Sequence, residues 1–219
     1  PINWKTYVPP KPHWLGVQAF EQYPLQQLRE RIDWTPFFQS WELAGKYPQI
    51  LKDEVVGGEA QKLYNDAQRM LDKIIAENWL TAKAVLGFFP ANSINDDDIE
   101  VYGDDKRKQV LLTLHHLRQQ SVKQEERYNH CLGDYIAPKE SRLNDYIGAF
   151  AVTAGIGIDE HVKRFERDHD DYNAIMLKAL ADRLAEAFAE RLHERVRKEF
   201  WGYAPAENLD NNALIAEQY

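Results

Sequence analysis

The 219 residues suffice for one large domain or two small ones, and 44% of them are hydrophobic, enough to build a sizeable core. The formal net charge of −8 argues against nonspecific nucleic-acid binding, which rests on Lys and Arg. No apolar run is long enough to cross a bilayer, and no signal-peptide pattern is present. Because Cys131 is the one cysteine, an intrachain disulfide and a thiolate-rich zinc site are excluded, and we expect a reducing, cytoplasmic setting.

The first third of the chain mixes prolines and aromatic residues with helical patterns. Residues 1–24 carry Pro9, Pro10, Pro12 and Pro24 among aromatic residues, which predicts an extended segment laid over the surface. Residues 25–32 predict a short helix, and residues 45–48 a turn. Apolar side chains recur at helical spacing over residues 59–78, which predicts a longer amphipathic helix.

The middle of the chain has the pattern of strands. Apolar runs at residues 84–90, 99–102, 110–117 and 146–153 predict four strands, and Asn95–Asp98 predicts a turn between the first two. Because the links are short or irregular, we expect a largely antiparallel sheet.

The last third predicts one long helix over residues 172–200, with acidic residues at its start and Gly202 as its stop. Its apolar stripe steps by four residues: Met176, Leu180, Leu184, Phe188, Leu192 and Val196. Helix, then sheet, then helix predicts an α+β fold, with a twisted, mostly antiparallel sheet flanked by helices, including one long helix near residues 170–200.

The segment Ile32-Asp33-Trp34-Thr35-Pro36-Phe37-Phe38 places one carboxylate beside three aromatic rings. Rings around a lone carboxylate suit a ligand with a flat apolar part and a cationic part, since a cation is attracted to both. The alternative is an aromatic core segment in which Asp33 caps a helix. The residues alone favour the second interpretation.

An acidic stripe on the long helix is the second candidate. Asp182, Glu186, Glu190 and Glu194 step by four residues, and the helical geometry turns them away from the apolar stripe. The simplest interpretation is a solvated helix face, and a binding surface is the alternative.

The histidines give no strong metal signal. His115 and His116 are adjacent on a predicted strand, so their side chains point to opposite faces and should not chelate one ion. His169 lies among aspartates, which could form a cation site but are typical of a helix N-terminus. We therefore predict no metal ligand.

Two further motifs are weak. Gly155–Glu160 follows a predicted strand, but a glutamate occupies the third glycine position of a dinucleotide fingerprint, where it would oppose a pyrophosphate. Cys131 has no neighbour in the sequence that would activate it, so we predict a packed thiol. No nucleophile–base pair stands out, and no catalytic residue is predicted.

Several separated segments, in their order and spacing, resemble the C-terminal activation domain of cobalamin-dependent methionine synthase. The resemblance covers essentially the whole chain, which we therefore interpret as one such domain over residues 1–219. The segments are Ile32–Phe38, Leu43–Pro48, Gly87–Asn92, Leu117–Gln120, Asp145–Phe150, and the run from Lys178–Ala187 to Trp201–Pro205.

This resemblance implies a function. The parent enzyme is a methyltransferase of methionine biosynthesis that transfers a methyl group from methyltetrahydrofolate to homocysteine through a cobalamin. Its activation domain binds S-adenosylmethionine and, with an electron from a flavodoxin-type donor, restores methylcobalamin after the cofactor has oxidised to cob(II)alamin. The cobalamin is held mainly by another domain, the implied docking partner, and zinc belongs to the parent enzyme only. Asp33 and Glu186 match acidic residues of the S-adenosylmethionine site.

One departure concerns the C-terminus. In the family, the helix that resembles residues 210–219 leads into an Arg-Pro-Ala-Pro-Gly-Tyr-Pro loop that contacts the ligand, whereas this sequence stops at Tyr219. We expect a C-terminally truncated domain that is inactive alone. Two alternatives stay open: a docking module for the cobalamin domain or flavodoxin that binds no small ligand, and a nucleotide-binding enzyme that uses Gly155–Glu160.

Overall fold

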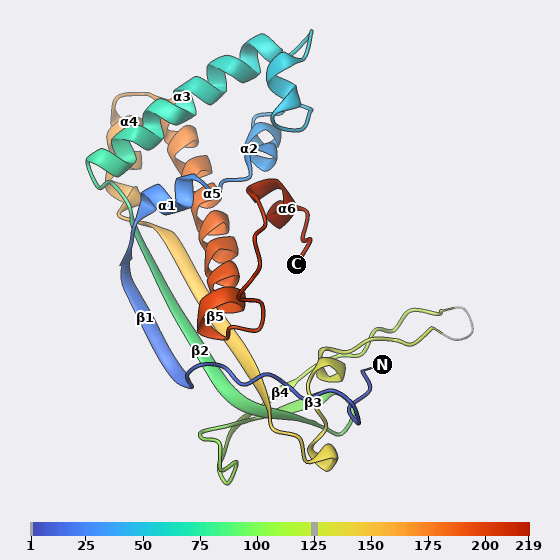
Figure 1. The fold of residues 1–219 in the computed structure, drawn as a ribbon. Helices are drawn as coiled ribbons and strands as arrows, with labels where there is room; N and C mark the ends of the chain where they lie inside the picture. The colour runs from blue at the N-terminus through green and yellow to red at the C-terminus, as the bar shows by residue number, and fades with distance from the viewer. Residues whose placement is uncertain (1, 124–126) are drawn as a thin grey trace. The chain divides into compact units, whose positions relative to one another are not determined.

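The computed structural model describes residues 2–123 and 127–219 (Figure 1). The elements in chain order are β1 (Gly16–Tyr23), α1 (Leu25–Arg29), α2 (Trp34–Ser40), η1 (Gln49–Lys52), α3 (Gly57–Ala76), β2 (Thr81–Ile94), β3 (Asp98–Tyr102), β4 (Val110–His115), η2 (Leu132–Tyr135), η3 (Lys139–Ser141), β5 (Asp145–Ile156), α4 (Ile158–Arg167), α5 (Asp171–Arg195), η4 (Val196–Phe200) and α6 (Asn211–Ile215).

The strands of the described residues form one sheet in the order β1-β2-β3-β4, and β5 also pairs with β2. Strand β3 is antiparallel to both β2 and β4. Helix α5 is 25 residues long. The predicted α+β class, the mostly antiparallel sheet and the long helix are confirmed.

The chain forms two compact units. The first consists of Pro1–Gln18, Leu86–Phe150 and Val196–Ala206, and the second of Ala19–Val85, Ala151–Arg195 and Glu207–Tyr219. Strands β1, β2 and β5 contribute residues to both units. Each unit has its own set of buried side chains.

The first unit is built around the β2–β3 hairpin. The register pairs Ile94 with Asp98, so the connection is short. Asn95 and Asp96 have φ values of +49° and +68°, the left-handed conformation that tight hairpin turns require and that Asn and Asp tolerate. The turn predicted at Asn95–Asp98 is confirmed.

The core of this hairpin consists of Ala91, Ile99 and Val101, with Leu114 and Ile147 among the side chains packed against it. It excludes water from one face of the hairpin, which fixes the register because a one-residue slip would expose every apolar side chain.

Cys131 is also buried in the first unit, at 3% exposure. Its thiol donates to the Asp97 carbonyl oxygen at 3.6 Å, and its backbone N–H donates to Asp134 Oδ2 at 2.9 Å. The predicted packed thiol is confirmed.

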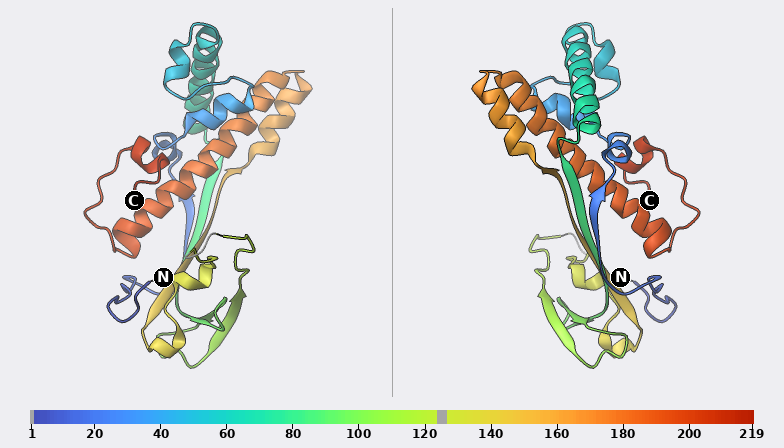
Figure 2. Two further views of the ribbon diagram at one scale, coloured as in Figure 1. Left: turned by 90° about the vertical axis from the view of Figure 1, so that its right-hand side faces the viewer. Right: turned by 90° about the vertical axis from the view of Figure 1, so that its left-hand side faces the viewer.

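The second unit is organised by α5, beside which α4 lies as a helical neighbour (Figure 2). Every residue of the predicted apolar stripe on this helix and the turn after it is buried, at 0 to 7% exposure: Met176, Leu180, Leu184, Phe188, Leu192 and Val196. Asp170 Oδ1 accepts the Asn173 N–H at 3.0 Å, so the acidic start of the helix serves as its cap.

Helices α1, α2 and α3 all pack against α5. Trp34, Phe37 and Phe38 of α2 are buried, as expected for an aromatic core segment. Helix α3 confirms the helix predicted over residues 59–78, because Leu63, Leu71 and the other apolar positions at helical spacing face the interior.

Within the segment expected to be extended, residues 1–24, residues 16–23 form strand β1, whose pairing in the sheet was not predicted; Pro1 lies outside the described residues. Most side chains of β1 are exposed, which removes the alternation of burial that reveals a strand.

The helix predicted at residues 25–32 ends at Arg29. After α5 the chain widens into a π turn, and Gly202, with φ of +81°, follows it as predicted.

None of the helices in the described residues combines the length and the apolar character that crossing a bilayer requires.

Candidate functional site

Asp33 begins helix α2 in the second unit. Its backbone is extended, and its Oδ1 accepts the Thr35 N–H at 2.9 Å, which satisfies one of the free N–H groups of the first turn. The capping role predicted for Asp33 is confirmed. Oδ2 has no hydrogen-bond partner among the described residues, so the carboxylate retains an acceptor for another group.

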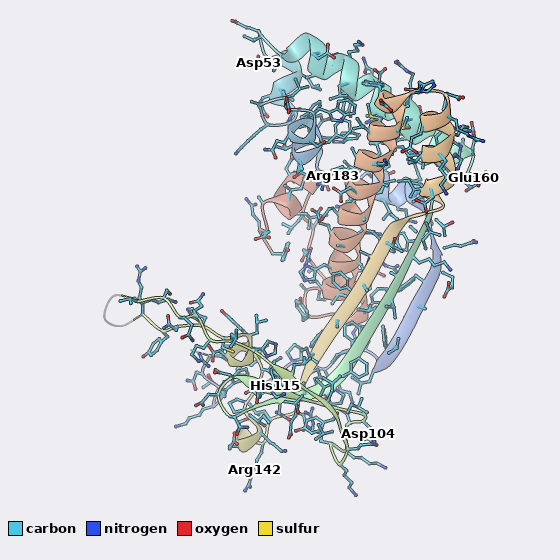
Figure 3. The ribbon with its side chains drawn as sticks, turned by 180° about the vertical axis from the view of Figure 1, so that it is seen from behind. Asp53, Asp104, His115, Arg142, Glu160 and Arg183 are labelled. Carbon is cyan, nitrogen blue, oxygen red and sulfur yellow. The ribbon has the colours of Figure 1, made fainter. Side chains whose placement is uncertain are left out.

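The negative charge of the acidic stripe on α5 is paired with arginine at both ends of the stripe. Asp182 accepts a hydrogen bond at 2.6 Å from Arg183, which is labelled on α5 in Figure 3. Glu194 is held by two arginines: Arg191 Nη1 lies 2.7 Å and Arg31 Nη2 3.0 Å from its Oε2. Arginine therefore offsets the first and the last carboxylate of the stripe.

The two central carboxylates of the stripe lack such partners. Neither Glu186 nor Glu190 makes a hydrogen bond or an ion pair with any residue that the structure describes, and Glu190 Oε2 is buried without a partner. A carboxylate oxygen removed from water without a donor is energetically unfavourable. An added cation or donor would therefore be stabilised here.

The negative charges of Asp33 and Glu186 both raise the pKa of Glu190. Burial raises the pKa of Glu190 above its ordinary value, and the charges of Asp33 and then Glu186 raise it further, while Arg183 and Arg31 lower it. The charges are thus close enough to interact, as expected from α2 packing against α5 and from the i, i+4 spacing of the two glutamates. Asp33, Glu186 and Glu190 are called the α2–α5 carboxylate cluster from here on.

The expectation of a solvated face is wrong for part of the stripe. Glu194 is only 4% exposed and Glu190 is half-buried, whereas Asp182 and Glu186 are exposed. Helices α1 and α2 pack against α5, and Arg31 from the connection between them reaches Glu194, contacts that the helical spacing of α5 does not reveal. Sequence reasoning did not select Glu190 as a site residue; its position one turn after Glu186 was the available signal.

The histidine candidates lie in separate places. His115 is exposed at the end of β4, with its Nδ1 2.9 Å from Asp98 Oδ1. His116 follows the strand, and its Nδ1 is buried without a partner among the described residues. His169 has φ of +54° in the turn before α5, beside the capping Asp170.

The backbone geometry at Gly157 accounts for a glycine in the turn before α4. Its φ is +98°, and a Cβ at this position would lie 2.8 Å from the Trp79 carbonyl oxygen. Backbone geometry and close packing therefore require glycine here. The chain then runs through α4 into α5 rather than into a parallel strand, so the context of a dinucleotide-binding βαβ unit is absent from these described residues.

A cavity of about 1020 Å³ lies in the first unit, lined by residues that include Trp4, Arg118, Tyr135 and Pro138. It contains neither Asp33 nor Glu186. Arg118 is already bound to Asp97 and Asp134, so this cavity offers no free cation from that side chain. Across residues 2–123 and 127–219, no three His, Cys, Asp or Glu side chains are placed to hold a metal ion.

Comparison with known proteins gives two findings. Residues 24–219 match the family described as "Vitamin B12 dependent methionine synthase, activation domain". A solved structure titled "Crystal Structure of the MetH Reactivation Domain bound to AdoHcy" superimposes with a TM-score of 0.96 and is 58% identical in sequence. The match covers 100% of this chain, which spans 66% of the length of that one. The chain therefore belongs to the family of vitamin B12-dependent methionine synthase activation domains.

Proposed function

We propose that this domain binds S-adenosylmethionine through Asp33 and Glu186 and supports the reductive remethylation of a cobalamin held mainly by another domain of a cytoplasmic methionine synthase. Family membership and the similar reactivation domain bound to AdoHcy support the choice of ligand. The electron comes from a flavodoxin-type donor in this proposal, and the zinc of the parent enzyme lies outside this domain.

The absence of arginine partners at the centre of the α5 stripe carries the proposal. Arginine compensates Asp182 and Glu194, but Glu186 and Glu190 have no ion pair among the described residues. S-adenosylmethionine carries an ammonium and a sulfonium, and each is attracted to nearby carboxylates. The cluster therefore suits this ligand, whose positive groups would take the place of the missing arginines.

The residues of this chain bind and orient in the proposed reaction. Asp33 uses one oxygen to cap α2 and has the other available for the ligand, so the helix start fixes the carboxylate that would meet the ammonium. Glu186 extends the negative surface along α5. When docked, the cobalamin would supply the cobalt that accepts the methyl group, and we assign no catalytic role to the described side chains of this domain.

Asp33→Asn and Glu186→Gln test the assignment. We expect each to weaken S-adenosylmethionine binding by roughly ten- to hundredfold, because a hydrogen bond to a charged group contributes about 1.5–3 kcal/mol. Titration calorimetry measures the affinities on this chain and on a parent chain extended beyond Tyr219.

Asp182→Asn is the matched control, because this carboxylate lies on the same helix and is already paired with Arg183. Its affinity should equal that of the unsubstituted protein. If Asp33→Asn left the affinity of a binding-competent protein unchanged, the role of Asp33 would be refuted.

One observation favours a second candidate, a docking module that binds no small ligand in this form. Val110, Leu111 and Leu112 on β4 are all exposed, and within the described residues β4 pairs only with β3. Exposed apolar side chains beside an unpaired strand edge suit a protein partner. S-adenosylmethionine binding by the extended chain but not by this one would favour this candidate for the 219 residues.

A further inference from the structure

The arginine–glutamate set at the end of the acidic stripe is unusual in its burial. The Glu194 side chain is 6% exposed, and those of its partners Arg31 and Arg191 are 22% and 25% exposed. Arg31 comes from the connection between α1 and α2, whereas Glu194 and Arg191 lie on α5. The set therefore joins two segments that are far apart in the sequence.

Stability alone does not account for this arrangement. Removing charged groups from water costs free energy, and well-packed apolar side chains often serve equally well or better. Ile32, the residue after Arg31, is buried, so this connection already contributes an apolar contact. What an ion pair adds is direction, since the hydrogen bonds of a guanidinium to a carboxylate fix orientation as well as distance.

The ion pair lies beside the proposed binding residues. Arg31 is two residues before Asp33, and Glu194 is two helical turns after Glu186. Glu190, between the two glutamates, is affected by the charges of both Asp33 and Arg31. The Arg31–Glu194 ion pair therefore links two segments: the connection that contains Asp33, and helix α5, which contains Glu186.

We propose that Arg31 and Glu194 are positioning residues, and that their ion pair holds Asp33 against the Glu186 side of α5 in the geometry that binds S-adenosylmethionine. The inference rests on the proposed function. Neither side chain contacts the ligand; both act through Asp33.

Arg29 provides a matched control for the ion pair. It lies in the last turn of α1, on the same segment as Arg31, and its Nη1 is 2.6 Å from Asp72 Oδ1 on α3. Asp72→Asn removes this ion pair without altering the connection to α5. If any ion pair that anchors this segment supported binding, losing either the Arg29–Asp72 or the Arg31–Glu194 pair would weaken it. If the role is to position Asp33, only loss of the Arg31–Glu194 pair would do so.

Titration of S-adenosylmethionine against the intact parent methionine synthase gives the first test. We expect Glu194→Gln to weaken binding by roughly two- to thirtyfold, the range in which substitutions away from a ligand change coupling to it. Asp72→Asn should have no effect. In an Asp33→Asn background, Glu194→Gln should cause no further loss, because the residue it positions is already inactive.

Arg31→Met repeats the test while Glu194 stays bound to Arg191, in case Glu194→Gln lowers stability. Circular dichroism and the melting temperature establish that each variant is folded. The inference is overturned if both variants bind as tightly as the unsubstituted enzyme while Asp33→Asn does not, or if the losses of Glu194→Gln and Asp33→Asn multiply in the double variant.

A second readout needs no ligand and therefore separates this inference from the proposed function. Carbon-detected NMR titration of Glu190 in this chain measures how strongly Asp33 acts on it. Asp33→Asn should lower the pKa of Glu190 in the otherwise unsubstituted chain and leave it unchanged in the Arg31→Met chain. Equal lowering in both would overturn the positioning role even if the parent enzyme failed to bind S-adenosylmethionine.

Discussion

At the scale of single residues, Glu190 is a half-buried carboxyl group of the second unit that has no hydrogen-bond or ion-pair partner among the described residues. One of its oxygens is buried without a partner, and the nearby carboxylates of Asp33 and Glu186 oppose its ionisation. The raised pKa means that folding shifts Glu190 towards its neutral form relative to the unfolded chain. The stabilisation that comes from protonated Glu190 is therefore fully present below the ordinary pKa of glutamate. It is lost as the pH rises through the raised pKa of the folded state.

Glu190→Gln should consequently stabilise the protein at neutral pH. We expect a gain of about 0.5 kcal/mol at pH 7, the order of a like-charge pair at i, i+4 spacing, and little difference at a pH below the glutamate pKa of about 4.3. Urea unfolding at both pH values measures the effect, with Glu30→Gln at an exposed position as the control. A gain that was larger in acid would contradict this account.

At the scale of elements, the start of α2 combines two roles of Asp33 that substitutions can separate. Asparagine retains the capping acceptor and removes the charge, whereas alanine removes both. We expect Asp33→Ala to lower the free energy of unfolding by about 1 kcal/mol and Asp33→Asn to change it little. Both should weaken ligand binding. Equal stability losses in chemical unfolding would show that the charge, rather than the cap, supports the helix.

The junction of β5 and α4 gives a second prediction at this scale. Alanine at position 157 would have to adopt φ near +98° and move the Trp79 carbonyl. We expect Gly157→Ala to cost about 1–3 kcal/mol. Gly58→Ala, in open space on α3, should be neutral or stabilising by up to about 1 kcal/mol. Thermal unfolding compares the two, and similar melting temperatures would rule out strain at Gly157.

At the scale of the whole molecule, the net charge of −8 favours a ligand with a net positive charge over one whose charges sum to zero. S-adenosylmethionine carries one more positive charge than AdoHcy. We expect its affinity to fall more steeply than that of AdoHcy as ionic strength rises from about 0.01 to 0.15 M, where the Debye length shortens from about 30 to 8 Å. Parallel titrations of the two ligands measure the slopes. Identical slopes would exclude an electrostatic contribution from the cluster to this preference.

The sequence predicted the elements whose burial follows their own periodicity. Helix α5 is the clearest case, because each residue of its apolar stripe proved to be buried. Strand β1 escaped prediction because most of its side chains are exposed, so neither face produces a pattern. A periodic sequence pattern therefore reveals a helix or strand only when one of its faces is buried and the other is exposed.

The candidate site was less accessible to sequence reasoning. The residues of the 32–38 segment favoured a cap for Asp33 and left a cationic ligand as the alternative, and the family resemblance then selected Asp33 and Glu186 as ligand residues. The interaction of Asp33 with Glu190, and the ion pair of Arg31 with Glu194, depend on contacts between segments about 160 residues apart. No local pattern encodes such a contact.

The burial of Cys131 has a practical consequence. Because the chain's one thiol is packed inside the first unit, it should react slowly with maleimide reagents while the protein is folded. A cysteine introduced at an exposed position of α5 could then carry a fluorophore or spin label without prior removal of the natural one. Distance measurements between that label and a tagged partner would become possible on the otherwise native protein.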